Sequence, residues 1–135
     1  MKLNKKTIEE IYRHAIEAYP EECCGIVTGA KDNQTGHLCL NIQNRLHKED
    51  PARHPRDART AYAIDRKELE RVVSLAEKNN EKVIAFYHSH TDHDAYFSET
   101  DKEAQTVFGE PEFPEAVHIV ISVKREEIKD IKYYK

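Results

Sequence analysis

The stretch Val83-Ile84-Ala85-Phe86-Tyr87-His88-Ser89-His90 joins an apolar run directly to two histidines. The apolar part predicts a buried strand from Lys82 to Tyr87 that delivers His88 and His90. Because side chains alternate between the two faces of a strand, the two imidazoles should point to the same side. A carboxylate returns at Asp101, and two imidazoles with one carboxylate are the ligand types of catalytic zinc sites, which leave the fourth position for water. The stretch is therefore a candidate metal site, and the alternative is a solvated polar loop.

The bulk composition predicts one small globular domain. The chain has 135 residues, 39% hydrophobic and 34% charged, so we expect a single domain over residues 1–135. The formal net charge of −4 argues against nucleic acid bound by bulk electrostatics. No apolar run is long enough to span a membrane, and the polar N-terminus predicts no signal peptide. Three cysteines without a secretion signal favour reduced thiols and a cytoplasmic location.

The first part of the chain predicts a helix followed by a β-hairpin. Thr7-Ile8-Glu9-Glu10 has the spacing of a capping box, and apolar residues then recur at helical spacing until Pro20 ends the helix. Cys24 to Thr28 predicts a central strand, and His37 to Gln43 alternates as a second one. Turn-forming residues lie between these two segments and favour a hairpin.

The middle of the chain predicts a long loop, a short strand and a helix. Asn44 to Arg59 is the least regular segment, and loops of this length in a compact domain are often functional. Thr60 to Ile64 predicts a short strand. Asp65-Arg66-Lys67-Glu68 again has capping-box spacing and predicts a second amphipathic helix that ends near Asn79.

The last third predicts a helix, a loop and two paired strands. Ser98-Glu99-Thr100-Asp101 can cap a short third helix that ends near Gly109, and Glu110 to Glu115 is expected to be a loop. Val117 to Val123 is rich in β-branched residues and predicts a strand. Ile128 to Tyr134 is expected to pair with it. Strands with helices interposed indicate an α/β (α+β) fold.

Zinc-assisted hydrolysis also requires a base and an oxyanion donor. A metal ion lowers the pKa of its water toward ~7, so a nearby carboxylate suffices as the base and can return the proton to the leaving amine. The base is expected from another part of the chain, because Glu99 and Asp92 are too tied to the local backbone to choose between. The residues alone do not select Glu22 over Glu21. Ser98 is the local hydroxyl that could reach a developing oxyanion.

Two other uses of these residues are weaker. Asp92, His93 and Asp94 could form an alternative ligand set, but an acid-rich loop fits solvation better. Cys24 could be a nucleophile with His88 as its base, but a cysteine next to glycine at the start of a strand is more often a small packed side chain.

The order of the candidate residues resembles the signature of a known family. His88-Ser89-His90, seven intervening residues and Ser98-x-x-Asp101 resemble the His-x-His-x(7)-Ser-x-x-Asp signature of the JAMM (MPN-plus) metallopeptidases. Glu22-Cys23-Cys24-Gly25, before an apolar strand, looks like the Glu-x-Cys-Gly segment of the same family. The resemblance runs from the first helix to the strand that begins at Val117.

The resemblance implies an MPN (cytidine-deaminase-like) fold, a mixed β-sheet flanked by helices. It implies zinc bound by His88, His90 and Asp101, with Glu22 as the general acid/base and Ser98 as the oxyanion donor. The small prokaryotic members that the chain resembles cleave the C-terminal tail of a ubiquitin-like sulfur-carrier protein, and cysteine peptidases are the most similar type. A deubiquitinase-like isopeptidase is the neighbouring possibility. A non-catalytic scaffold of the same fold that binds a partner is the alternative from another class.

The resemblance also implies how a carrier protein is held. Members of the family add an extended carrier tail to a sheet edge beside the site. We expect Thr60 to Ile64 to provide that edge. We also expect Arg53, Arg56 or Arg59 to meet an acidic surface of the carrier.

Overall fold

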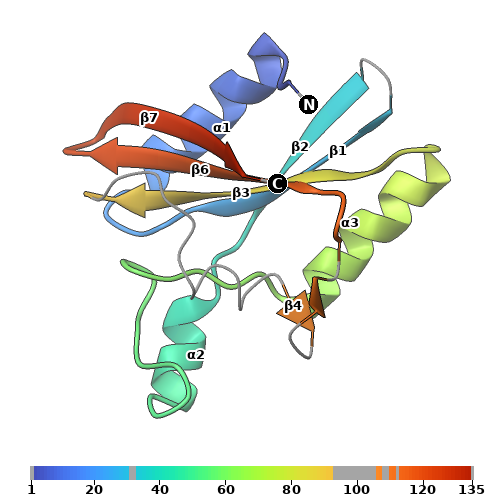
Figure 1. Ribbon diagram of the computed structural model, residues 1–135. Coiled ribbons are helices and arrows are strands. Elements are labelled where there is room, and N and C mark those ends of the chain that lie inside the picture. The colour runs from blue at the N-terminus through green and yellow to red at the C-terminus, as the bar shows by residue number, and fades with distance from the viewer. Residues whose placement is uncertain (1, 31–32, 93–105, 108–109, 112, 135) are drawn as a thin grey trace.

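The structure, a computed structural model, describes residues 2–30, 33–92, 106–107, 110–111 and 113–134. One five-stranded sheet has the strand order β2-β1-β3-β6-β7 (Figure 1). Its strands are β1 Cys24–Ala30, β2 Asn33–Cys39, β3 Lys82–Thr91, β6 Val117–Lys124 and β7 Glu127–Tyr134. β3 and β6 run parallel, and the other neighbouring pairs of this sheet run antiparallel. A mixed sheet flanked by helices confirms the expected α/β (α+β) fold class.

Two helices, α1 Lys5–Ala18 and α3 Arg66–Lys78, cover the two faces of this sheet. The helix α2 Gln43–Glu49 follows β2. Ile11 of α1 shares a buried cluster with Val27, whereas Val72 of α3 shares another with Ile26. Because Ile26 and Val27 are consecutive strand residues, the two clusters lie on opposite faces, as Figure 1 shows for α1 and α3. No helix in the described part of the chain is both long and apolar enough to cross a membrane.

The two longer helices begin at side-chain caps. The α1 cap is Asn4, whose Oδ1 accepts a hydrogen bond from the Thr7 N at 2.9 Å. The predicted cap at Thr7 is therefore wrong, because Thr7 lies inside the first turn and is only 1% exposed. Asp65 caps α3 as predicted, by accepting a hydrogen bond from the Lys67 N at 2.8 Å.

The hairpin of β1 and β2 is confirmed, but its second strand lies earlier than predicted. The structure has this strand at Asn33–Cys39 instead of His37 to Gln43. Gln43 begins α2, and its backbone N donates to the Asn41 Oδ1 at 3.0 Å, which turns the chain out of the sheet. The prediction of a long loop from Asn44 to Arg59 is also wrong in its first part, because α2 extends to Glu49.

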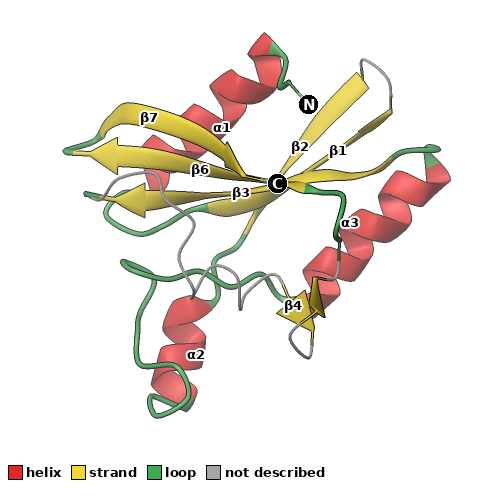
Figure 2. Cartoon of the chain, viewed as in Figure 1, coloured by secondary structure: helices red, strands yellow, loops and turns green. Residues whose placement is uncertain are grey.

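The segment from Thr60 to Ile64 is not the predicted strand. Among the described residues, its strand-like pairing is an isolated bridge between Asn41 and Ile64. Backbone groups of Ala61 and Ala63 bond to the side chain of Asn41 instead of to a neighbouring strand. The connection from α2 to α3 is therefore an irregular loop (Figure 2), and the edge strand expected to receive a carrier tail is not formed here.

The last two strands form the expected hairpin. β6 and β7 pair antiparallel across a turn made by Arg125 and Glu126. Both turn residues have positive φ, 52° and 66°, which matches the twist of a two-residue hairpin loop. The two strands complete the sheet on the β3 side.

The predicted third helix begins at Ser98, which lies outside the described residues. Its predicted end near Gly109 is wrong, because the strand β4 Thr106–Val107 pairs with β5 Glu110–Pro111. The loop predicted from Glu110 to Glu115 is therefore wrong at its first two residues, which form the strand β5.

Candidate active site

His88 and His90 lie side by side on β3. The strand continues to Thr91, so both histidines are strand residues and their shared face is confirmed. Their ring centroids are 5.0 Å apart, and the rings are inclined by 57°. Both side chains are buried, with exposed fractions of 2% and 4%. The sheet thus presents two neighbouring imidazoles from one strand.

Glu22 lies across from these histidines, just before β1. The Ser89 N donates to the Cys23 O at 3.1 Å, in the register of the antiparallel β1–β3 ladder. Extending this register by one residue gives His90 as the residue opposite Glu22, which itself precedes β1. Since Glu22 is 3% exposed, the site combines a buried carboxylate with two buried imidazoles.

The neighbouring Glu21 has a different environment. Its side chain is exposed, and its Oε2 accepts a hydrogen bond from the Asn44 Nδ2 at 2.9 Å. Burial therefore distinguishes Glu22 from Glu21, a distinction that the sequence spacing had left open.

Hydrogen bonds hold the backbone on both sides of Glu22. The Glu22 N donates to the Ala58 O at 2.7 Å, and the Asn41 Nδ2 donates to the Glu22 O at 2.9 Å. The next residue, Cys23, donates its backbone N to the Ser89 Oγ at 2.8 Å. Ser89 is fully buried, so the serine between the two histidines serves to dock the start of β1 on β3.

Tyr62 packs flat against His88. The ring centroids are 4.4 Å apart and the planes are inclined by 20°. Tyr62 is only 4% exposed, so its ring restricts the orientations open to the imidazole. The sequence pattern assigned Tyr62 to an edge strand, and no local signal connects it with a histidine so far along the chain.

Gly25 makes room for Tyr87 on the opposite face of the sheet. A Cβ atom at Gly25 would overlap the Tyr87 ring. Tyr87 is 1% exposed, and its hydroxyl shares a hydrogen bond of 2.7 Å with the His14 Nδ1. The glycine of the Glu-Cys-Cys-Gly segment therefore serves packing beneath the site.

The thiols beside Glu22 are buried and keep their protons. Burial raises the pKa of the Cys23 thiol to about 12 and raises the pKa of Cys24 well above its usual value. A protonated thiol is a poor nucleophile. The structure therefore supports the packed role of Cys24, which has no measurable exposure.

Asp92 follows β3 and is held away from a metal-ligand role. Its carboxylate accepts a hydrogen bond from the Tyr19 hydroxyl at 2.8 Å and another from the Arg125 N at 3.2 Å. These contacts tie the end of β3 to the β6–β7 turn. The other members of the alternative ligand set, His93 and Asp94, lie outside the described residues.

The expected zinc ligands are only partly within the described residues. His88 and His90 supply two adjacent imidazoles, a donor type that zinc binds readily. Asp101, the expected third ligand, and Ser98 lie outside the described residues. Across the residues that are described, no three His, Cys, Asp or Glu side chains form a metal-binding group. The donor pair fits zinc, and a complete ligand set depends on Asp101.

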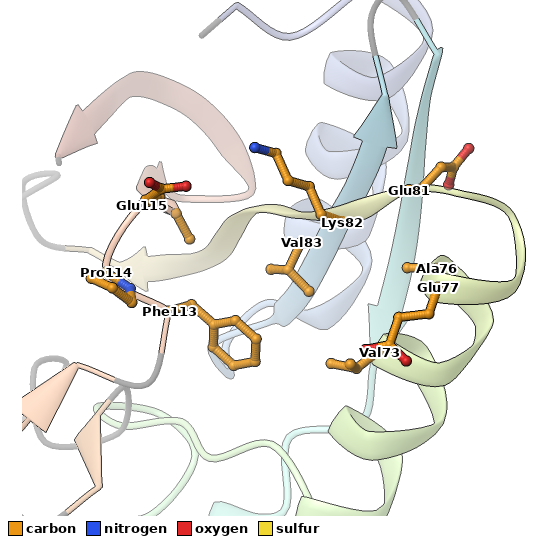
Figure 3. A pocket seen from close by; sticks show the side chains of 10 residues that line it. Val73, Ala76, Glu77, Glu81, Lys82, Val83, Phe113, Pro114 and Glu115 are labelled. Atoms are coloured by element: carbon orange, nitrogen blue, oxygen red, sulfur yellow. The ribbon is translucent and has the colours of Figure 1, made fainter.

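A cavity of about 360 Å³ lies at the other end of β3 (Figure 3). Val83 of β3, Val73 of α3 and Phe113 are among the side chains that line it. Val83 precedes His88 by five residues, which is about 16 Å along a strand. The cavity is therefore separate from the candidate active site.

A mixed sheet with two buried imidazoles on one strand and a buried carboxylate just before the neighbouring strand is a scaffold suited to metal-assisted hydrolysis. Residues 4–133 match the family model described as prokaryotic homologs of the JAB domain. The chain therefore belongs to this family, which confirms the resemblance drawn from the His-x-His and Glu-x-Cys-Gly segments.

Two similar proteins carry enzyme names. A CysO-cysteine peptidase from Mycobacterium tuberculosis is 24% identical over 128 residues, which cover 95% of this chain and 77% of that protein. A desampylase from Haloferax volcanii is 30% identical over 99 residues, which cover 70% of this chain and 65% of that protein. Together with the family match, these names support a hydrolase of the JAB family.

Solved structures agree on the fold. A JAB1/MPN domain protein from Archaeoglobus fulgidus has a TM-score of 0.58 and 19% identity, with 100% of this chain and 89% of that chain covered. A protein from Salinibacter ruber has a TM-score of 0.60 and 24% identity, with 98% and 80% covered. These similarities confirm the MPN-type fold expected from the sequence.

Proposed function

We propose that this protein is a zinc-dependent metallopeptidase that cleaves a peptide or isopeptide bond at the C-terminal tail of a ubiquitin-like or sulfur-carrier protein. The observation that carries the proposal is the buried Glu22 carboxylate, which adjoins Cys23, whose backbone O accepts from the Ser89 N between the two buried imidazoles. Membership of the JAB family supports the reaction class. The names of the two relatives support a carrier protein as the substrate.

In this proposal, His88, His90 and Asp101 hold the zinc ion. When bound, zinc acts as a Lewis acid and lowers the pKa of a water molecule toward ~7. Glu22 would take a proton from the attacking water and return it to the leaving amine. Ser98 donates a hydrogen bond to the oxyanion that develops on the scissile carbonyl.

Burial makes the Glu22 carboxylate suitable as a general base. Few water molecules compete for it, and hydrogen bonds to Ala58 and Asn41 hold its backbone at both the N–H and the carbonyl. A base fixed in this way meets the reacting water in one orientation, which favours proton transfer.

The loop between α2 and α3 is proposed to meet the carrier protein. It borders the site, because the Ala58 O accepts from the Glu22 N and the Arg59 O accepts from the Thr91 Oγ1 at 2.8 Å. Its exposed cations, called here the loop arginines, are Arg53, Arg56 and Arg59. Their charges suit an acidic surface on the carrier and would speed its encounter with the site.

We also propose that residues 1–135 act as one domain in the cytoplasm. In this proposal, neither nucleic acid nor a membrane is a partner.

A deubiquitinase-like isopeptidase is the second candidate and uses the same residues. The similarity to the desampylase favours keeping it beside the cysteine-type peptidase. A non-catalytic scaffold differs from both, since it binds a partner and cleaves nothing.

Mass spectrometry of carrier fusions tests the proposal. Sulfur-carrier proteins extended by one residue through a peptide bond, or joined to a lysine peptide through an isopeptide bond, are incubated with the purified protein. We expect release of the extension by protein that holds about one zinc per chain. His88→Ala should lose both the zinc and the cleavage.

The same assay separates the candidates. A faster release from one of the two fusions selects the cysteine-type peptidase or the isopeptidase. A zinc-loaded protein that releases neither extension would contradict the proposed function and favour the scaffold.

A further inference from the structure

The side chain of Asn41 connects three segments that surround the candidate active site. Asn41 lies between the end of β2 and the start of α2. Its Nδ2 donates to the Glu22 O at 2.9 Å and to the Ala61 O at 3.1 Å. Its Oδ1 accepts from the Gln43 N at 3.0 Å and from the Ala63 N at 3.1 Å. Both donors and both acceptor positions of the amide are therefore in use.

The partners of this amide are backbone groups next to the functional side chains. One is the carbonyl of Glu22 itself. Two others belong to Ala61 and Ala63, the residues on either side of Tyr62, whose ring stacks on His88 at 4.4 Å. A single side chain thus fixes the backbone of the buried carboxylate and the backbone of the ring that orients an imidazole.

We infer that Asn41 is a positioning residue of the active site, which sets Glu22 relative to the stacked pair of Tyr62 and His88. Its role in catalysis rests on the proposed function, whereas its role in orienting His88 does not. Asn41 touches neither the reacting atoms nor the metal ligands directly. It acts through the backbone of Glu22 and through the Tyr62 ring.

The amide is required because the four partners are two carbonyls and two N–H groups. Aspartate has nearly the same shape but cannot donate, so Asn41→Asp sets a carboxylate against the carbonyls of Glu22 and Ala61. Alanine leaves all four backbone groups without the amide. Both changes remove the bonds from the amide to the carbonyls of Glu22 and Ala61, but they leave the bond from the Glu22 N to the Ala58 O and every proposed catalytic side chain in place.

Steady-state kinetics and NMR spectroscopy of the full-length protein test this role. The matched control is Thr28→Val, which removes a partly buried hydrogen bond of 2.9 Å to the His37 Nε2 at the far end of β1. With a cleavable carrier fusion, Asn41→Asp should lower kcat about 10- to 100-fold, as mutations of residues that support the functional side chains from behind commonly do. KM should stay within about twofold of the wild-type value. Zinc content should stay as in the wild type, and Thr28→Val should keep the wild-type kcat.

The NMR measurement does not depend on activity. The ring current of Tyr62 changes the chemical shifts of the His88 ring protons. The variant Tyr62→Leu gives the chemical shifts of these protons in the absence of that ring current. Asn41→Asp should move these signals toward the Tyr62→Leu position, and Thr28→Val should leave them in place. Hydrogen exchange at the Ala63 amide, whose acceptor is the Asn41 Oδ1, should accelerate in Asn41→Ala and not in Thr28→Val.

The outcomes separate the two proposals. If the wild type cleaves no fusion but Asn41→Asp shifts the His88 signals, the proposed function fails and the orienting role of Asn41 stands. If the wild type is active and Asn41→Asp matches Thr28→Val in kcat and in the His88 signals, the inference about Asn41 is overturned.

Discussion

Replacing Gly25 by alanine tests the packing beneath the candidate active site. Gly25 is on β1, three residues after Glu22, and an added Cβ would overlap the Tyr87 ring. Tyr87 is only 1% exposed, so its ring has no solvent-filled space to move into. Its hydroxyl also shares the 2.7 Å hydrogen bond with the His14 Nδ1, and a displaced ring loses this bond.

Two effects set the size of the destabilisation. Overpacking of a filled core costs about 1–3 kcal/mol. Loss of the hydrogen bond between Tyr87 and His14 adds about 0.5–1.5 kcal/mol. Gly25→Ala should therefore lower the free energy of unfolding by about 1.5–4.5 kcal/mol, a large share of the total stability of a typical domain.

Urea unfolding followed by circular dichroism measures this difference. Gly36→Ala on β2 is the matched control, because a Cβ there meets nothing closer than the Glu10 Oε2 at 4.0 Å. Its free energy of unfolding should change by no more than about 0.5 kcal/mol. In a Tyr87→Leu background, the effect of Gly25→Ala should shrink to less than half. An equal effect with and without the Tyr87 ring would refute the explanation by overlap.

Three other outcomes concern docking, the strand junction and pH. Charge reversal of the loop arginines should raise KM for a carrier fusion while kcat stays similar, and an unchanged KM in steady-state kinetics would contradict the docking proposal. Ser89→Ala removes the acceptor of the buried Cys23 N, so urea unfolding should show a loss of about 1–3 kcal/mol; a loss below ~0.5 kcal/mol would argue against that junction. Burial lowers the pKa of His14 from its ordinary 6.5. The unfolded chain therefore binds this proton more tightly, and the stability contributed by neutral His14 is present above pH 6.5 and lost as the pH falls through the lowered pKa. Unfolding midpoints measured across this range should fall less steeply in His14→Gln, and equal slopes would exclude His14 as the cause.

Local sequence patterns predicted the elements whose periodicity is regular. The apolar spacing that includes Ile11 and Ala15 predicted α1, because those side chains recur on one helical face and reach the core. The β-branched run after Val117 predicted β6, and the apolar run before His88 predicted the buried strand β3. The spacing of the two histidines on a strand was enough to predict their shared face, since alternation in a strand needs no tertiary information.

Contacts between segments that are distant in the sequence could not be predicted from local sequence patterns. The segment around Tyr62 has the composition of a strand, but its backbone groups bond to Asn41 and its ring packs on His88. The approach of the Glu22 segment to the His88 strand depends on the bond from the Ser89 N to the Cys23 O, which no property of either residue alone determines. The helix cap at Asn4 was missed because Thr7 offered an equally suitable local pattern, and the buried position of Thr7 decided between them.

The comparison of Glu22→Gln with Glu21→Gln in zinc-loaded protein tests most directly whether Glu22 is the catalytic base. The two substitutions remove neighbouring carboxylates, but Glu22 is buried beside the imidazoles and Glu21 is exposed. Zinc content is measured by elemental analysis and carrier cleavage by mass spectrometry. We predict that Glu22→Gln keeps its zinc and loses about 10²–10⁴-fold in kcat, whereas Glu21→Gln cleaves like the wild type. Cleavage by Glu22→Gln at the wild-type rate, with zinc bound, would contradict the assignment of Glu22 as the base.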